Sequence, residues 1–263
     1  MTPTRTSYSA LHHRTQPLTG PGCVLASMPG YQTKQEQVRI RGVADLTIRS
    51  LLDRQQYADP LGAAQQLGIS SAAWPLFGLL WPSAAQLAAR LGARRVTLGE
   101  RILEIGCGLG LASLVGHRRG ADMTASDCHP LAGSFLGENV RLNGLVPLRY
   151  RHGHWSASAP QRQQAADAGL CALSGRFDLI VGSDLLYERD EAGDLAHFIA
   201  GHAAAGAQAW IVDPDRGNRT TFNRHMLAQG FALTELRLDQ PASLDQRAYK
   251  GRLLTYHLNS PIQ

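Results

Sequence analysis

The chain is predicted to form an α/β fold: a Rossmann-like, doubly wound, mostly parallel seven-stranded sheet with a C-terminal antiparallel hairpin and a small N-terminal hairpin. Its 263 residues and 44% hydrophobic content suit one domain with a sizeable core. From Arg101 onward, apolar runs of strand length alternate with helical segments, which is typical of parallel βαβ units. No helical segment separates the last two runs, so we expect those strands to pair antiparallel.

The chain is expected to have three parts. Residues 1–34 are rich in Ser, Thr, Pro and Gly and are interpreted as a flexible tail. A transit peptide is the alternative, but several prolines interrupt the amphipathic helix that it needs. Residues 35–73 are interpreted as an accessory hairpin and helical segment, and residues 74–263 as the main domain.

The first regular elements precede the βαβ units. Residues 37–52 alternate apolar and polar positions on both sides of a turn at residues 42–45, as a hairpin does. Residues 79–92 are predicted to be helical, with Ser83 placed to cap the helix, apolar spacing through Leu87 and Leu91, and Gly92 to end it.

The main sheet follows in regular order. Strands are expected at residues 101–106, 122–127, 148–155, 177–184, 208–214, 231–239 and 249–258. Helices are expected at residues 111–119, 130–143, about 191–204 and 218–229. The polar segment 156–175 is interpreted as a surface insertion. In open parallel sheets, ligands lie beyond the carboxyl ends of the strands, near the point where strand order reverses.

Composition excludes several partners. The net charge is +5, but the arginines are scattered and no aromatic residues interleave with them, so we expect no nucleic-acid partner. No uncharged apolar stretch approaches the roughly 18 residues that cross a bilayer, so we expect no membrane partner. The cysteines are far apart and form no CxxC pair, which indicates neither a zinc site nor a disulfide framework and favours a cytoplasmic location.

A glycine-rich turn follows the first strand of the main sheet. Gly106, Gly108 and Gly110 lie between that strand and a helix, the context in which such a turn binds a ligand. Glycine allows positive φ and close approach of the backbone. Asp127 ends the next strand, where its carboxylate can accept bonds from both hydroxyls of a ribose. A tight turn without a ligand is the alternative.

Two nucleoside cofactors bind to a glycine-rich turn with an acid at the end of the next strand. A dinucleotide needs the spacing G-x-G-x-x-G, but Leu111 occupies the position of the third glycine. S-adenosylmethionine (SAM) carries a sulfonium and an amino group, and Glu104 before the first glycine would favour these positive groups and oppose a pyrophosphate. The pattern therefore favours SAM, while NAD remains open.

Four motifs together carry a family resemblance: WPS at 81–83, LEIGCGLG at 103–110, SDCHP at 126–130 and GSDLLYE at 182–188. On these motifs, residues 75–258 resemble the seven-β-strand (class I) SAM-dependent methyltransferases. The D-x-x-Y pattern of the fourth motif is similar to that of the protein lysine methyltransferase branch, which includes the chaperone and electron-transfer-flavoprotein β-subunit enzymes. The sequence DPDRGNR at 213–219 resembles the flavoprotein-methylating members.

The resemblance implies a SAM site. Trp81 and Trp155 would flank the cofactor, Asp127 would hold its ribose, and Ser183 would lie beside the adenosyl group. For each tryptophan, a core position is the alternative. The expected cofactor-binding residues are Trp81, Glu104, Gly106, Cys107, Gly108, Gly110, Asp127, Trp155 and Ser183.

The expected catalytic residues are Asp184 and Tyr187. A lysine amine must arrive neutral to act as a nucleophile. Asp184 could accept a hydrogen bond from the amine, and Tyr187, one helical turn later, could line the entrance. The alternative for Asp184 is that it caps the following helix. No metal is expected, because His152 and His154 have no third ligand at a sensible spacing.

These observations predict a methyltransferase that uses SAM and acts on a protein lysine. A small-molecule or arginine methyltransferase is the alternative within the class. Outside it stand an NAD-dependent oxidoreductase and an inactive cofactor-binding protein. The N-terminal region and the segment 156–175 have no counterpart in the resemblance, and such regions usually recognise substrates.

Overall fold

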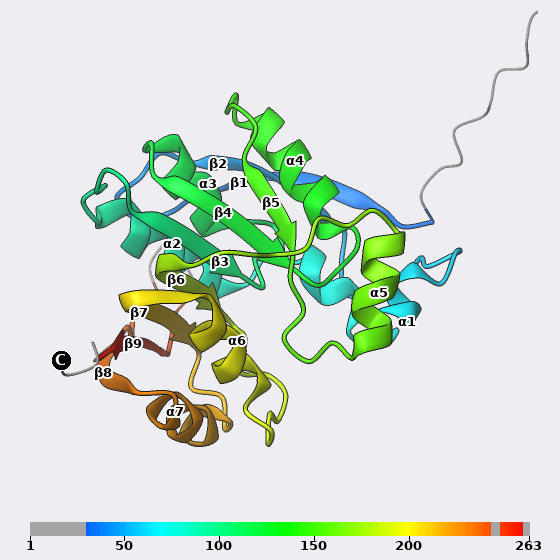
Figure 1. Ribbon diagram of the computed structural model, residues 1–263. Helices are drawn as coiled ribbons and strands as arrows, with labels where there is room; N and C mark the ends of the chain where they lie inside the picture. Colours follow the sequence, from blue (N-terminus) through cyan, green and yellow to red (C-terminus); the bar gives the residue numbers. More distant parts are fainter. Residues whose placement is uncertain (1–29, 243–247, 260–263) are drawn as a thin grey trace, which may run out of the picture.

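The computed structural model describes residues 30–242 and 248–259 (Figure 1). Most of the expected N-terminal tail lies outside the described residues. Its last residues do not: strand β1 (Thr33–Val38) begins inside the segment 1–34, so the expected boundary cuts through a strand.

The predicted seven-stranded sheet is confirmed. Its spatial order is β5-β4-β3-β6-β7-β9-β8, and only the pairs that involve β9 are antiparallel. The order reverses at β3, which lies between β4 and β6. The strands are β3 (Arg101–Ile105), β4 (Asp122–Asp127), β5 (Arg149–His152), β6 (Phe177–Ser183), β7 (Ala203–Asp213), β8 (Phe231–Arg237) and β9 (Arg252–Leu258).

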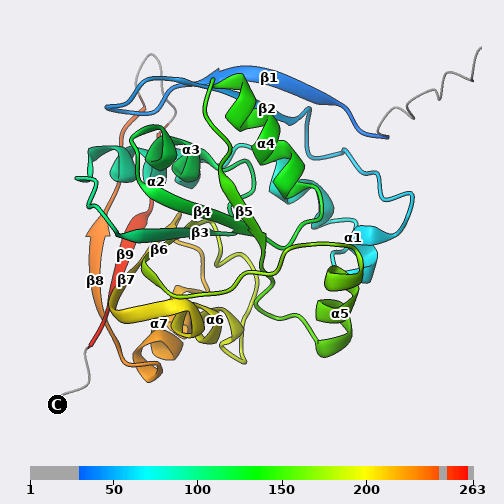
Figure 2. The ribbon, with the colours of Figure 1, turned by 45° about the horizontal axis from the view of Figure 1, so that its top comes forward.

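Helices cover both faces of the sheet, as Figure 2 shows. One face packs against α2 (Pro82–Ala93), α3 (Leu111–Arg118) and α4 (Ala132–Leu142). The other packs against α6 (Asp194–His202) and α7 (Arg219–Ala228). Neighbouring strand residues alternate between the two cores: Ile102 belongs to the first and Leu103 to the second. This alternation explains why the strands read as continuous apolar runs.

The N-terminal hairpin is confirmed, but its turn is longer than expected. β1 pairs antiparallel with β2 (Leu46–Leu51), and residues 39–45 connect them. Asn139 of α4 and Asn143, its C-cap residue, accept hydrogen bonds from the outer edge of β2: the Arg49 amide donates to Asn139 Oδ1 over 2.8 Å, and the Thr47 amide donates to Asn143 Oδ1 over 3.0 Å. The hairpin therefore shares the main core instead of standing apart.

Two local expectations were wrong. Ser83 does not cap α2, because Trp81 is the N-cap residue and the Ser83 hydroxyl lies 3.0 Å from the Tyr249 hydroxyl. Tyr187 lies in a turn, not one helical turn after Asp184. The segment 156–175 is mostly exposed, as expected of a surface insertion, and it contains α5 (Ala159–Asp167), which was not predicted.

Candidate active site

A cavity of about 770 Å³ lies beyond the carboxyl ends of β3, β4 and β6, where the strand order reverses. This is the position that the sequence predicts. The N-terminal segment and the turn after β6 close its sides. The wall includes Arg54, Ile69, Trp81, Gly106, Cys107, Gly108, Asp127, His129, His154, Trp155, Ser183, Asp184, Tyr187 and Arg216.

The glycine turn has the backbone that the sequence predicts, but protein atoms also require it. Gly106, Gly108 and Gly110 all have positive φ. A Cβ on Gly108 would lie 2.7 Å from the carbonyl oxygen of Phe77, and a Cβ on Gly110 would lie 2.3 Å from a methyl of Leu136. The three glycines are therefore as much a packing requirement as a ligand signature, and Gly110 does not line the cavity.

Asp127 ends β4 and braces the turn. Its Oδ2 accepts from the amide of Gly108 over 2.8 Å, and its Oδ1 accepts from the amide of His129 over 2.9 Å. Burial raises the pKa of this carboxyl, and the amide bonds oppose that shift. Each carboxylate oxygen has a further lone pair, so Asp127 can still accept hydroxyls from the cavity.

Glu104 lies elsewhere than expected. Its carboxylate does not line the cavity; Oε2 accepts from the amide of Ser113, in the first turn of α3, over 2.7 Å. The side chain is 2% exposed, and desolvation raises its pKa to about 7. The Glu104 carboxylate therefore lies at the N-terminus of α3, where the helix dipole favours a negative charge.

Aromatic side chains form two parts of the wall. Trp81 and Trp155 are half-buried and line the cavity, so neither is a core residue. The indole of Trp81 donates to the carbonyl of Leu76 over 2.9 Å, which fixes its ring. A Cβ on Gly106 would lie 3.7 Å from Cη2 of Trp155, so this indole borders the glycine turn.

His129 is a wall residue that was not among the expected site residues. Its imidazole stacks on Phe77 with ring centroids 3.7 Å apart, and burial lowers its pKa to about 3. Its Nε2 has no hydrogen-bond partner in residues 30–242 and 248–259. The only signal was its place directly after the strand that Asp127 ends.

Asp184 follows β6 at the cavity wall and is 8% exposed. Its Oδ1 accepts from Arg216 Nη2 over 3.0 Å, and its Oδ2 has no partner among the described residues. It does not cap a helix, because Asp190 accepts the amides at the start of α6. Tyr187 is 44% exposed at the same wall.

Ser183 and Cys107 also line the cavity. Ser183 is the last residue of β6, beside Asp184. Cys107 lies inside the glycine turn, and burial raises the pKa of its thiol well above the usual range. This thiol is therefore a poor nucleophile, which fits a backbone role.

None of the helices in residues 30–242 and 248–259 is both long and apolar enough to span a bilayer. Within the same residues, no group of three or more His, Cys, Asp or Glu side chains is placed to hold a metal ion.

Solved structures establish the fold class. A ribosomal protein L11 methylase from Lactobacillus delbrueckii subsp. bulgaricus superposes with a TM-score of 0.50 and 20% identity, over 69% of this chain and 81% of that one. A candidate SAM-dependent methyltransferase from Streptococcus mutans superposes with a TM-score of 0.52 and 11% identity, over 85% of this chain and 55% of that one. The chain therefore has the seven-strand, class I methyltransferase fold.

Sequence relatives narrow this class. The electron transfer flavoprotein beta subunit lysine methyltransferase of Rattus norvegicus is 29% identical over 65% of this chain and 62% of its own length. The protein N-lysine methyltransferase METTL21A of Mus musculus is 28% identical over 72% of this chain and 79% of its own length. No protein-family profile matches.

The resemblance read from the motifs is thus confirmed: the curated relatives of this chain are protein lysine methyltransferases. The chain spans about three fifths of the flavoprotein-methylating relatives that it matches, 62% of the rat enzyme and 60% of the mouse enzyme.

Proposed function

We propose that this protein transfers a methyl group from SAM to a lysine side chain of another protein. The observation that carries the proposal is that two carboxylates, those of Asp127 and Asp184, line the same cavity. Asp127 lines the cavity at the end of β4, where it would accept the ribose hydroxyls, and Asp184 has a buried oxygen without a partner in the part of the chain that the structure describes. The names of the relatives support the substrate class.

The residues present fit SAM. The cavity volume lies within the range of small-molecule sites, roughly 300–1,000 Å³. Asp127 would accept the ribose hydroxyls, and the turn from Gly106 to Gly108, with Cys107 supplying backbone, would adjoin the methionine part. Trp81 and Trp155 present ring faces that suit an adenine or a sulfonium, a contact of about 0.5 to 2 kcal/mol. Ser183 would lie beside the adenosyl group.

A dinucleotide fits less well. Its pyrophosphate would rest on the N-terminus of the helix after the glycine turn. In this protein the Glu104 carboxylate already accepts the Ser113 amide there. When Glu104 is ionised, a second anion would be repelled, so the acid before the glycines still opposes a pyrophosphate although it does not face the cavity.

The protein's part in the reaction is alignment and desolvation. Bound SAM supplies a methyl group that its sulfonium already activates. The acceptor lysine, with an ordinary pKa of about 10.4, must lose its proton before it attacks. Asp184 Oδ2 would accept a hydrogen bond from the amine and orient its lone pair, while Tyr187 would wall the entrance.

Substrate recognition is assigned to the two segments without a counterpart in the resemblance. α1 (Ala63–Gln66) and α5 lie side by side at one end of the molecule (Figure 1). Gln161 of α5 lies so close to Gly68 that a Cβ there would be 2.5 Å from its amide nitrogen. Arg54 and Ile69 belong to the same N-terminal segment and line the cavity. A protein segment that docks here would therefore have a side chain within reach of Asp184.

The remaining expectations stay proposals. We infer a cytoplasmic location, which the free cysteines Cys107, Cys128 and Cys171 of the described part support. We also infer that the partner is a protein, without a nucleic-acid or membrane partner.

Trideuteromethyl SAM tests the function directly. The protein is incubated with this donor and either purified electron transfer flavoprotein β subunit or a cell lysate, and mass spectrometry locates the label. We expect label on lysine Nζ, and much slower labelling with Asp184→Asn because the amide cannot accept a charge-assisted bond. Asp178→Asn, at the opposite end of β6, is the matched control and should retain activity. Label on arginine or on small molecules only, or no label at all, would contradict the proposal.

A further inference from the structure

Arg216 is the closest charged partner of Asp184 and comes from the loop after β7. Its Nη2 donates to Asp184 Oδ1 over 3.0 Å, across 32 positions of sequence. The Arg216 side chain is 36% exposed and lines the cavity. It therefore occupies one oxygen of the carboxylate, while the other, Oδ2, is buried and has no hydrogen-bond partner among the described residues.

Further bonds tie the loop after β7 to the loop after β6. The amide of Asp184 donates to the carbonyl of Val212 over 3.0 Å, and Asn218 Nδ2 donates to the carbonyl of Leu186 over 3.0 Å. The Arg216 amide in turn donates to Asp213 Oδ2 over 2.9 Å. The two loops therefore hold Arg216 and Asp184 in a fixed relation.

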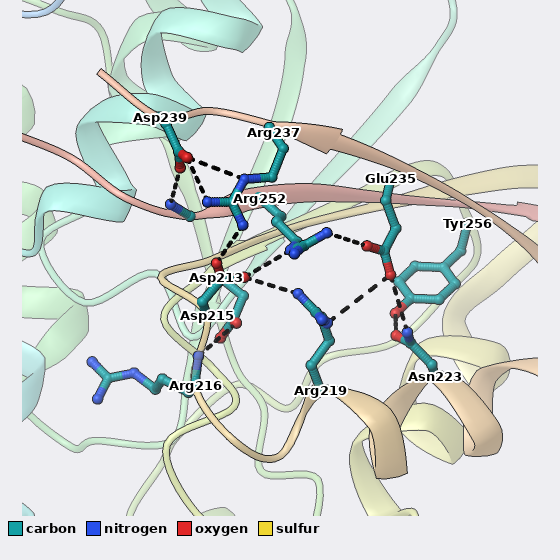
Figure 3. Close-up of polar contacts among 11 residues, drawn as sticks. Asp213, Asp215, Arg216, Arg219, Asn223, Glu235, Arg237, Asp239, Arg252 and Tyr256 are labelled. Atoms are coloured by element: carbon teal, nitrogen blue, oxygen red, sulfur yellow. Dashed lines mark hydrogen bonds and ion pairs between the residues drawn. The ribbon is translucent and has the colours of Figure 1, made fainter. Parts of the chain in front are cut away.

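The far side of the same loop is anchored to the C-terminal hairpin, as Figure 3 shows. Asp215, which has a φ of 59°, accepts from the guanidinium groups of Arg219, Arg237 and Arg252 over 2.7 to 2.8 Å. Arg216 points away from this group of ion pairs. The loop thus presents consecutive residues in opposite directions, Asp215 to the hairpin and Arg216 to Asp184.

We propose that Arg216 is a positioning residue for methyl transfer, which holds Asp184 so that only its second oxygen is offered to the acceptor amine. The inference rests on the proposed function. Arg216 acts through Asp184 and not on the methyl donor. Its loss should therefore lower kcat on the protein substrate and leave the affinity for S-adenosylhomocysteine (SAH) unchanged.

A double-mutant cycle tests this assignment. We expect Arg216→Gln to lower kcat by about 10- to 100-fold, the effect of losing one hydrogen bond between charged groups, and Arg216→Lys to recover part of that loss. Calorimetry with SAH should give affinities within about twofold of the wild type, which also shows that the variants fold. Because Arg216 acts through Asp184, the variant with both Asp184→Asn and Arg216→Gln should be no slower than Asp184→Asn alone.

Arg224→Gln supplies the matched control. Arg224 lies on the neighbouring helix α7, is exposed, and makes no ion pair among the described residues, so this variant removes the same charge without touching Asp184. The inference is overturned if Arg216→Gln is as active as Arg224→Gln, or if the two site substitutions multiply as independent effects. A wild-type protein that labels no lysine contradicts the proposed function itself and removes the inference with it.

Discussion

Asp127 and Asp184 end different strands and differ in how their oxygens are occupied. Both oxygens of Asp127 accept backbone amides, whereas Asp184 has one oxygen paired with Arg216 and one without a partner in the described residues. A carboxylate whose two oxygens are both fixed by hydrogen bonds suits the recognition of a ligand that does not change charge. A carboxylate with one oxygen left without a partner suits a residue that accepts a hydrogen bond from the reacting amine. We therefore propose that Asp127 serves the cofactor and Asp184 the substrate.

Asp127→Asn should weaken SAH binding by about 10- to 100-fold, because an amide loses the charge-assisted bonds to ribose hydroxyls. Isothermal calorimetry measures the effect. Asp122→Asn, at the opposite end of β4 in an ion pair with Arg149, is the control and should bind as the wild type does. Equal affinities for all three proteins would remove Asp127 from the cofactor site.

Glu104 makes folding stability depend on pH. Its folded pKa of about 7 is above its ordinary value, because burial favours the neutral form. The folded protein therefore holds this proton more tightly, so the stability that Glu104 contributes is fully present below about pH 4.5 and is lost as the pH rises through about 7.

Glu104→Gln should remove this dependence. In urea unfolding, the variant should match the wild type near about pH 5 and exceed it at about pH 8, by a free energy on the order of 3 kcal/mol. Asp127 and Asp213 also have raised pKa values, but both proteins retain them, so the difference isolates Glu104. A constant difference at both pH values would show that Glu104 does not change its charge in this range.

At the scale of elements, apolar periodicity decided which segments were predictable. The sheet strands carry continuous apolar runs because both faces are covered, and they were found with only their ends misplaced. The start of β1 was misplaced because its sequence, TKQEQV, is polar and none of its residues is buried. α5 was missed because Ala165 is its one buried residue, although Ser158 and Gln161 form a capping box that was visible in the sequence.

The site was predictable in part. Asp127, Ser183, Asp184 and Trp155 lie at or just after strand ends and line the cavity, because strand ends in a parallel sheet converge on one edge. Trp81 lines it from the N-terminus of α2 and was found through the motif. The direction of Glu104 was not predictable, since both faces of β3 are buried. The ion pair of Arg216 with Asp184 and the stacking of His129 on Phe77 depend on contacts between distant segments that no local spacing encodes.

The C-terminal hairpin stabilises the loop after β7 through Asp215. Asp215→Asn tolerates the positive φ but weakens three ion pairs, each contributing about 0.2 to 1 kcal/mol, so the free energy of unfolding should fall by about 1 to 2 kcal/mol. High salt should shrink the difference. Asp239→Asn, which loses its ion pair with Arg237, is the control and should cost less in the same denaturation experiment. A salt-independent loss would contradict an ionic origin.

At the scale of the whole molecule, the sheet collects residues from distant parts of the chain around one cavity. The order β5-β4-β3-β6-β7-β9-β8 places the ends of β3, β4 and β6 side by side, and residues of the N-terminal segment, among them Arg54 and Ile69, complete the cavity wall. The central claim is that this cavity accepts a sulfonium nucleoside in preference to a dinucleotide.

Crystallisation of the full chain with equal concentrations of SAH and NAD tests that claim most directly. We predict density for SAH alone, with its ribose hydroxyls bound to Asp127 and its sulfur beside the glycine turn, on the side that faces Asp184. Density for NAD in the cavity, with its pyrophosphate at the N-terminus of α3 and SAH absent, would contradict the account.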